Sequence, residues 1–256
     1  MSGDPLIVTF SDAEYLPLLH CWLARLARLG MRRCRVYGLD ATTVEWCRRR
    51  GIDTVALSWK RGDLQDLWVQ RIQVFSSLLR EGEEFIHSDT DAVWLRNPLQ
   101  SGSAVERTED ILFSQGTVWP PDVHSAWGFV LCCGWFRARS TPGVISFFSA
   151  LEDDVRASGD DQISVNRLLL GAGANWGRND AAAYRLAFRD KWLQCWETPI
   201  VARLGAPALS VALLPHREFQ RLPESTGDAI VKHFLTPKDC GQKIMVMKKL
   251  GLIETN

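Results

Sequence analysis

The sequence has no excess of charge of either sign and no long apolar run. Thirty Lys and Arg residues balance thirty Asp and Glu residues among the 256 residues. A chain without net charge has no overall basic field to attract nucleic acid, so we expect no nucleic-acid partner. A membrane-spanning helix needs roughly 18 consecutive apolar residues or more. No stretch approaches that length, so we expect no membrane span.

The cysteines do not form the pairs that secreted or zinc-binding proteins need. There are seven of them, an odd number, and no two are separated by two residues. This excludes a disulfide framework and a zinc ribbon. Residues 1–10, MSGDPLIVTF, lack the basic segment of a signal peptide, and their apolar run is short. We therefore expect a cytoplasmic protein with reduced, mostly buried cysteines.

Several catalytic motifs are also missing. There is no GxGxxG after the first apolar run, no phosphate-binding P-loop, no GxSxG and no HExxH. These absences argue against a Rossmann dehydrogenase, a P-loop nucleotidase, an α/β-hydrolase and a zinc metalloprotease. The chemistry must therefore lie in other residue patterns.

The first hundred residues alternate between short apolar runs and amphipathic segments. We expect strands at residues 6–10, 34–38, 54–57 and 84–88, and helices at 15–29, from Thr42 or Thr43 to 50, and from Asp63 to 81. This alternation predicts an α/β fold with a mostly parallel sheet and helices on both faces. Ligands bind at the carboxyl ends of such strands, so the loops after Phe10, Gly38 and Ser88 are expected to carry the chemistry.

The second half is less regular. We expect strands at residues 111–115, 129–136, 209–214 and 229–234, helices at 141–156, from Asp160 or Asp161 to 170, and 242–250, and a loop at 171–179. No linker or repeat separates the halves. We therefore expect one domain, residues 1–256, with a nucleotide-binding half (1–100) and an irregular half (101–256).

The first candidate site is the acidic pair Asp89 and Asp91, which follows the strand predicted at 84–88. Two carboxylates in one turn can bind one Mg²⁺ or Mn²⁺, and that cation can bridge to a diphosphate. The alternative is a solvated turn or a helix cap. His233 follows a predicted strand and could be a third ligand, although a lone histidine is more often structural.

Other candidates have equally simple alternatives. Asp161 and Gln162 begin a predicted helix and could face a sugar, or the acidic residues there could only cap the helix. Arg71 could contact a phosphate or lie at the surface. Lys238 and Lys243 could neutralise a leaving phosphate. We interpret the remaining histidines, His20, His87, His124 and His216, as structural, and Cys132 and Cys133 as buried rather than nucleophilic.

Four segments in order resemble a known family. They are residues 84–99 (EFIHSDTDAVWLRNPL), 131–141 (LCCGWFRARST), 160–169 (DDQISVNRLL) and 230–234 (IVKHF). Together they resemble the nucleotide-diphospho-sugar transferase family, glycosyltransferases with the GT-A fold. The chain is similar to the plant-type xylosyl-, arabinosyl- and galactosyltransferases. It departs from the family where Cys132 and Cys133 replace Asn-Thr.

The resemblance implies transfer of a sugar, with retention, from a nucleotide-sugar donor, a UDP-sugar, with Mn²⁺ or Mg²⁺ as cofactor. It implies a metal site at Asp89, Asp91 and His233, and donor contacts from Thr9, Phe10, Arg71, Asp89 and Lys238. It further implies that Asp161 and Gln162 face the reacting sugar and that Gly134 and Trp135 line the acceptor side. The acceptor could be a small molecule, a lipid-linked intermediate or a protein. The alternatives are a nucleotidyltransferase that makes sugar nucleotides and a non-catalytic nucleotide-sugar-binding module.

Overall fold

The computed structural model describes residues 4–99, 107–177, 181–188, 190–205, 208–221, 229–235 and 239–253. Its helices within these ranges are α1 (Leu16–Arg28), α2 (Ala41–Arg48), α3 (Leu64–Arg80), α4 (Pro121–Trp127), α5 (Pro142–Ser158), α6 (Asp161–Gly171) and α7 (Cys240–Lys249), with a 3-10 turn, η1, at Ala13–Tyr15. Its strands are β1 (Leu6–Ser11), β2 (Cys34–Gly38), β3 (Thr54–Ala56), β4 (Phe85–Ser88), β5 (Ala92–Trp94), β6 (Ile111–Gln115), β7 (Leu131–Ala138), β8 (Trp176–Gly177), β9 (Ala183–Phe188), β10 (Lys191–Trp196), β11 (Ile200–Leu204), β12 (Leu209–Leu213), β13 (Phe219–Gln220) and β14 (Val231–His233).

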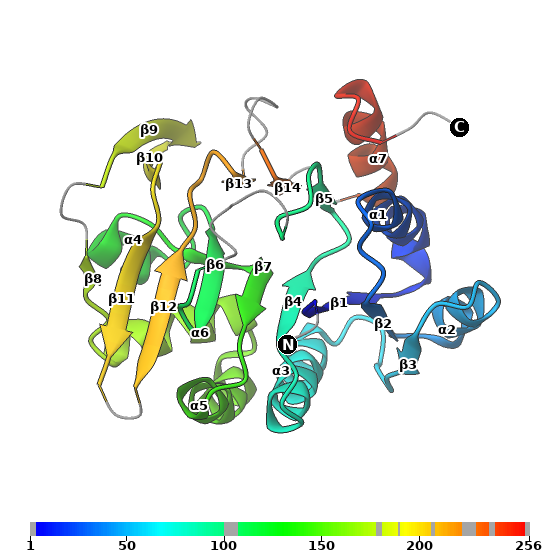
Figure 1. Ribbon diagram of the computed structural model, residues 1–256, viewed down its shortest axis with the longest axis horizontal. Coiled ribbons are helices and arrows are strands. Elements are labelled where there is room, and N and C mark those ends of the chain that lie inside the picture. Colours follow the sequence, from blue (N-terminus) through cyan, green and yellow to red (C-terminus); the bar gives the residue numbers. More distant parts are fainter. Residues whose placement is uncertain are drawn as a thin grey trace.

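A nine-stranded sheet in the order β3-β2-β1-β4-β7-β6-β12-β11-β8 forms the centre of the described structure (Figure 1). The pairings of β1 with β2 and β4, of β2 with β3 and of β6 with β12 are parallel. Within this sheet only β7 and β11 run opposite to the others. The prediction of a mostly parallel α/β sheet is therefore confirmed, and the second half of the chain extends the same sheet.

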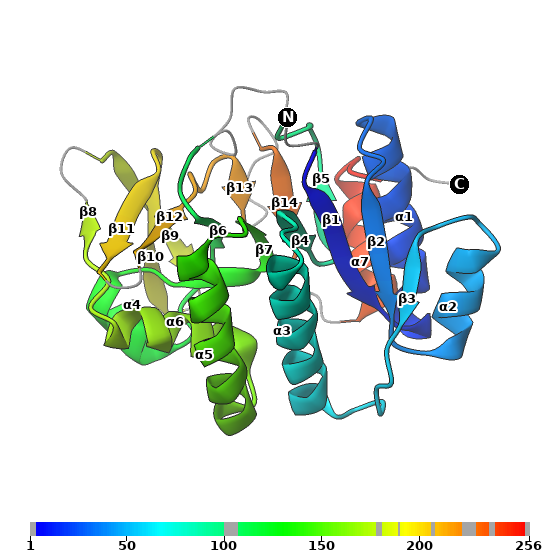
Figure 2. The same cartoon turned by 60° about the horizontal axis from the view of Figure 1, so that its bottom comes forward.

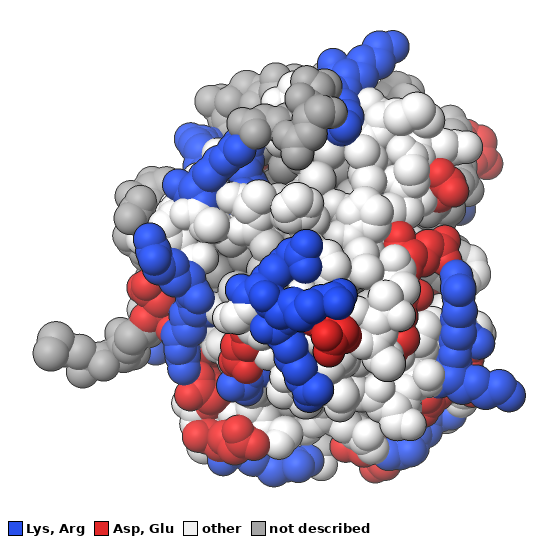
Figure 3. Space-filling model, turned by 90° about the vertical axis from the view of Figure 1, so that its right-hand side faces the viewer, with Lys and Arg blue, Asp and Glu red and all other residues white. Residues whose placement is uncertain are grey.

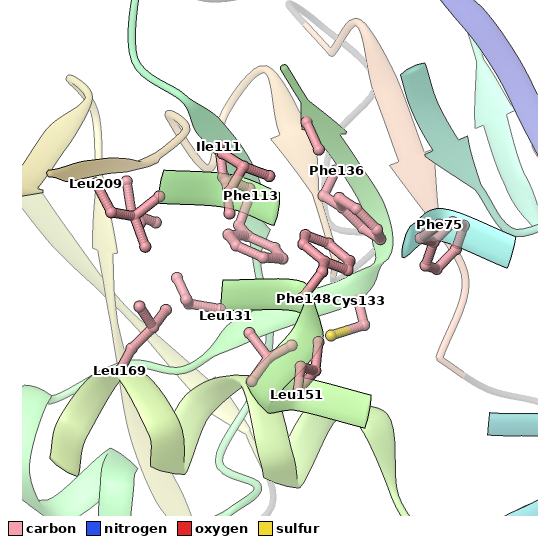
Figure 4. Close-up of a cluster of buried hydrophobic side chains, with 14 of the residues drawn as sticks. Phe75, Ile111, Phe113, Leu131, Cys133, Phe136, Phe148, Leu151, Leu169 and Leu209 are labelled. Atoms are coloured by element: carbon pink, nitrogen blue, oxygen red, sulfur yellow. The ribbon is translucent and has the colours of Figure 1, made fainter. Parts of the chain in front are cut away.

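Helices cover both faces of the sheet, as predicted. Phe75 of α3, Phe148 of α5 and Leu169 of α6 belong to one large apolar core, drawn in Figure 4. Leu19 of α1 and Cys47 of α2 belong to a second core on the opposite face. Figure 2 shows α3 and α5 in front of the sheet, with α1 and α7 behind the strands at the other side. Burial of these two apolar cores stabilises the sheet, and the strand order of the sheet determines where the loops at its carboxyl edge lie.

Local signals set the helix starts. Asp63 accepts a hydrogen bond from the backbone N–H of Asp66, and Thr141 caps α5 with Pro142 in its first turn, both as predicted. The cap of α2 is a correction, because Asp40 rather than Thr42 or Thr43 caps it.

A small sheet, β13-β14-β5, lies above the carboxyl end of β4 and was not predicted in this form. Its strands have only two or three residues each. The β9–β10 hairpin was also not predicted, because β9 alternates in burial and has no continuous apolar run. In this small sheet, His233 on β14 pairs with Ala92 on β5. The pairing brings the C-terminal segment next to the residues that follow β4.

Charges of both signs lie interspersed on the face of the molecule drawn in Figure 3. Exposed ion pairs of the described residues include Arg35–Asp53 at 2.8 Å and Arg33–Glu83 at 2.6 Å. Among the described helices, none combines the length and the apolar character that a membrane span requires.

Candidate active site

Two carboxylates and an imidazole converge at the carboxyl end of β4. One ligand atom from each of Asp89, Asp91 and His233 lies within 4.8 Å of the other two. His233 Nε2 is 3.0 Å from Asp91 Oδ1 and 3.5 Å from Asp89 Oδ2. The chain turns here because the Asp89 N–H donates to the Gly134 carbonyl and the Ala92 N–H donates back to the Asp89 carbonyl. The strand β5 then pairs with β14, which delivers His233 to the two carboxylates.

The charges in this cluster support one another. Burial would raise the pKa of Asp89, but the hydrogen bond from His87 and the Arg71 charge lower it overall. Burial likewise opposes the ionised form of Asp91, and His233 overcomes this and lowers its pKa. The pKa of His233 rises to about 9, although burial and Arg221 would lower it, because Asp91 and Cys132 stabilise its charged form. The ammonium group of Lys243, on α7, contacts Asp91.

Arg71 lies inside the protein rather than at its surface, since the residue is only 4% exposed. Its Nη1 lies 3.6 Å from Asp89 Oδ1, and its Nη2 lies 3.3 Å from Asp161 Oδ2. The guanidinium also lies 4.7 Å from the centre of the Trp68 ring, a cation–π distance. Arg71 therefore connects the cluster of Asp89, Asp91 and His233 to the start of α6.

His87 belongs to this network, although the sequence suggested only a structural role. Its Nε2 lies 2.9 Å from Arg71 Nη2 and 3.1 Å from Asp89 Oδ1, and its Nδ1 lies 3.2 Å from the Val8 carbonyl oxygen. Burial and the Arg71 charge lower its pKa to about 4. His87 is thus neutral at pH 7. The signal was its spacing, because residues 87 and 89 leave the strand on the same face.

Asp161 and Gln162 point to different partners. Asp160 is the cap of α6, and Asp161 lies in the first turn of that helix without serving as the cap. Asp161 is 6% exposed and its Oδ2 makes no hydrogen bond within the described residues. Burial raises its pKa to about 6, against the lowering effect of Arg71. The Gln162 amide instead donates to the Trp119 carbonyl at 3.0 Å.

A cavity of about 320 Å³ opens beside the two carboxylates. Its walls fall into an aromatic and apolar part and a charged part. The first contains Phe10, Leu39, Trp59, Leu64, Leu67 and Trp68, and the second contains Asp12, Arg71, Asp89, Asp91, Arg221, His233 and Lys243. Phe10 stacks on Tyr37 with ring centres 5.0 Å apart.

The resemblance also implied donor contacts from Thr9 and Lys238 and an acceptor-side position for Trp135. Thr9 is fully buried, and its hydroxyl makes no hydrogen bond within the described residues. Trp135 is a correction: its side chain is fully buried between Trp94 and Phe219, so its indole has no surface to offer an acceptor. Lys238 lies outside the described residues.

Gly134 lies against two residues of the Asp89, Asp91 and His233 cluster. A β-carbon at this position would stand 2.0 Å from His233 Cε1 and 2.6 Å from Asp89 Oδ2. No real side chain fits at such distances, so only glycine allows the strand to pass this close. The acceptor-side role that the resemblance implied for Gly134 stays a prediction; the structure shows that this glycine lies next to His233 and Asp89.

Cys132 and Cys133 have different surroundings, although the sequence suggested one structural role for both. Burial would raise the pKa of Cys132, but Arg221 and His233 together lower it to about 7. Burial raises the pKa of Cys133 well above its usual value. The Cys132 Sγ lies 3.6 Å from His233 Nδ1. No sequence signal marked this contact, because 101 positions separate the two residues.

Comparisons with known proteins identify the family and the fold. The sequence profile described as nucleotide-diphospho-sugar transferase matches residues 30–244. No curated protein sequence matches the chain. Among solved structures, galactosyltransferase LgtC, in complex with donor and acceptor sugar analogues, aligns with 98% of this chain and 96% of its own, at 13% identity and a TM-score of 0.50.

A second similar structure is the apo form of the glycosyltransferase GlyE from Streptococcus pneumoniae TIGR4. It aligns with 99% of this chain and 65% of its own, at 9% identity and a TM-score of 0.53. Another GlyE structure aligns with 65% of this chain and 43% of its own, at 12% identity and a TM-score of 0.43. The chain therefore spans less than two thirds of the length of GlyE. At these identities the first two likenesses show a shared fold.

Proposed function

Because this chain belongs to the nucleotide-diphospho-sugar transferase family, we propose that it is a metal-dependent glycosyltransferase. It moves a sugar from a nucleotide-diphosphate donor, a UDP-sugar, to an acceptor hydroxyl, with retention of configuration. The observation that carries this proposal is the convergence of Asp89, Asp91 and His233 at a cavity whose lining also contains aromatic side chains.

The two parts of the cavity wall match the two parts of such a donor. A nucleobase is flat and apolar on its faces, which suits the wall that contains Phe10, Trp59 and Trp68. A diphosphate is anionic, and the bare carboxylates of Asp89 and Asp91 would repel it. A divalent cation between them removes this repulsion, so the proposal requires one.

The donor atoms fit Mn²⁺ or Mg²⁺. Carboxylate oxygens are the ligands these hard cations prefer, and an imidazole nitrogen is also tolerated by Mn²⁺. Asp89, Asp91 and His233 would hold the cation, with diphosphate oxygens and water completing its shell. When bound, the cation supplies a Lewis acid that stabilises the nucleoside-diphosphate leaving group.

The chain's own residues supply the rest of the proposed mechanism. Arg71 holds Asp89 and Asp161 at 3.6 and 3.3 Å, so the two carboxylates keep a fixed separation. Asp161 Oδ2 makes no hydrogen bond within the described residues besides its ion pair with Arg71, and the carboxylate would stabilise the positive charge that develops on the sugar as the glycosidic bond breaks. Gln162, the other candidate at the reacting sugar, is anchored to the Trp119 carbonyl.

The proposed location is the cytoplasm. The seven cysteines are all free, which supports a reducing compartment such as the cytoplasm. The acceptor would then be a small molecule, a lipid-linked intermediate or a protein of that compartment.

The test is calorimetric titration of UDP into the protein with Mn²⁺ and with EDTA. We expect binding only with the cation, followed by release of UDP from a UDP-sugar under the same conditions. Equal UDP affinity in Mn²⁺ and in EDTA would contradict metal dependence. Binding without any UDP release from a range of UDP-sugars would favour a non-catalytic binding module.

A further inference from the structure

The imidazole of His233 lies between two different environments. Its Nε2 faces Asp91 Oδ1 at 3.0 Å and Asp89 Oδ2 at 3.5 Å. Its Nδ1 faces Cys132 Sγ at 3.6 Å, within the range of a hydrogen bond to sulfur. The two nitrogens point away from each other across the ring. A cation shared by the carboxylates and Nε2 is therefore out of reach of the cysteine sulfur.

The strand β7 builds the cysteine side of this arrangement. Successive side chains of a strand point to opposite faces, so residues 132 and 134 share the face that meets His233. Cys133 points the other way, into the apolar core with Phe148 and Leu151 (Figure 4). The register of β7 against β6 shifts between Phe113 and Ser114, a β-bulge of the kind that often aims side chains at an active site.

Cys132 is itself held in place. The Gly134 N–H donates to its Sγ at 3.4 Å, and the cysteine is only 1% exposed. The missing side chain of Gly134 leaves the space that the imidazole fills, since a β-carbon there would stand 2.7 Å from Nδ1. The ring thus rests on a cradle made by Cys132 and Gly134.

We propose that Cys132 is the positioning residue of His233. Its Sγ accepts a hydrogen bond from Nδ1–H, which fixes the tautomer whose Nε2 lone pair points between Asp89 and Asp91. Histidines that bind metals commonly donate their second ring N–H to such a partner, which orients the ring. This inference rests on the proposed function, because it assigns Cys132 to the metal site proposed there.

The test measures Mn²⁺ affinity of the full-length protein directly, by electron paramagnetic resonance of the free ion and without sugar nucleotide. We expect Cys132→Ala to weaken Mn²⁺ binding by about 10- to 100-fold, the usual cost of losing such a partner. Cys132→Asn should restore much of the affinity, because its amide oxygen can accept the same hydrogen bond. Cys133→Ala is the matched control, since it removes a neighbouring thiol from the opposite face of the strand and should leave Mn²⁺ affinity unchanged.

A second measurement separates positioning from general loss of structure. In the wild type with Mg²⁺, a two-bond ¹H–¹⁵N spectrum should show His233 protonated at Nδ1. In Cys132→Ala the spectrum should show a mixture of tautomers. A folded Cys132→Ala variant with wild-type Mn²⁺ affinity and an unchanged tautomer would overturn the role of Cys132 alone. A wild-type protein that binds no Mn²⁺ either alone or together with UDP would overturn the proposed function, and with it this inference.

Discussion

Arg71 on α3 and Asp161 at the start of α6 meet inside the protein, where Arg71 Nη2 lies 3.3 Å from Asp161 Oδ2. Both residues are nearly inaccessible to solvent, at 4% and 6% exposure. Burying a charged pair costs desolvation energy, and a buried pair is seldom kept for stability alone. The same arginine also contacts Asp89 of the proposed metal site. This buried pair supports the proposal that Asp161 acts in the reaction rather than only in the stability of α6.

Changing Asp161 to Asn keeps its size and removes its negative charge. We expect kcat to fall by about 100-fold or more, as when other electrostatic groups of a transition state are removed. The KM for the donor should change little, because the charge matters most when the glycosidic bond breaks. Steady-state kinetics with saturating Mn²⁺ checks this. A variant with a lower melting temperature and wild-type kcat would show that Asp161 is only structural.

The buried His216 should make the fold sensitive to acid. The side chain accepts or donates one hydrogen bond, at 2.7 Å between its Nδ1 and the Tyr184 hydroxyl, and it is 2% exposed. Burial and the Arg217 charge lower its pKa to about 4. The unfolded chain takes up the proton near pH 6.5, so His216 favours unfolding progressively as the pH falls from about 6.5 toward 4.

Between pH 7 and pH 5, this one histidine should cost about 2 kcal/mol of unfolding free energy. His216→Asn keeps a polar group near Tyr184 but does not titrate, so its loss of stability over the same interval should be smaller by about that amount. Urea unfolding of both proteins at the two pH values measures the difference. Identical pH dependence would mean that the pKa of His216 is the same in the folded and the unfolded protein.

Trp135 should affect stability rather than acceptor binding. Its ring centre lies 4.6 Å from that of Phe219 and 6.0 Å from that of Trp94, with no exposed surface. Trp135→Ala should lower the free energy of unfolding by about 3–5 kcal/mol, the usual cost for a large buried aromatic. The milder Trp135→Phe should fold and keep the wild-type KM for the acceptor. A raised acceptor KM in a stable Trp135→Phe protein would return this residue to the acceptor side.

Much of the first half was predictable because its signals are local. The short segment Cys34–Gly38 was predicted as a strand at its observed bounds, and Asp63 marked the start of α3. The three-residue β5 was not predicted, because so short a segment carries no strand pattern of its own. The strand β14 lies inside the segment predicted at 229–234, but its pairing with β5 joins distant parts of the chain and has no local signal.

The residues of the site were likewise predictable where their pattern is local in the sequence. The spacing of Asp89 and Asp91 after β4 is a local pattern, and period-two alternation could have added His87 to it. The contacts of His233 with Cys132 and of Arg71 with Asp161 join segments 101 and 90 positions apart, and no local pattern encodes them. The resemblance supplied the residues but not their neighbours, so it did not indicate that Trp135 is buried against Phe219.

Gly134→Ala tests the close approach of β7 to the metal site. The new methyl group would stand 2.0 Å from His233 Cε1 and 2.6 Å from Asp89 Oδ2, so both ligands must move. Misplacement of an active-site group by about 1 Å can cost 100-fold in rate, and we expect at least about that loss in kcat/KM together with weaker Mn²⁺ binding. Gly177→Ala is the control, because its methyl would meet only ordinary contact, 3.6 Å from the Val201 carbonyl oxygen, in another strand of the same sheet. Mn²⁺ titrations and melting curves of both variants decide the matter: a folded Gly134→Ala protein with wild-type Mn²⁺ affinity would mean that the imidazole does not need this space.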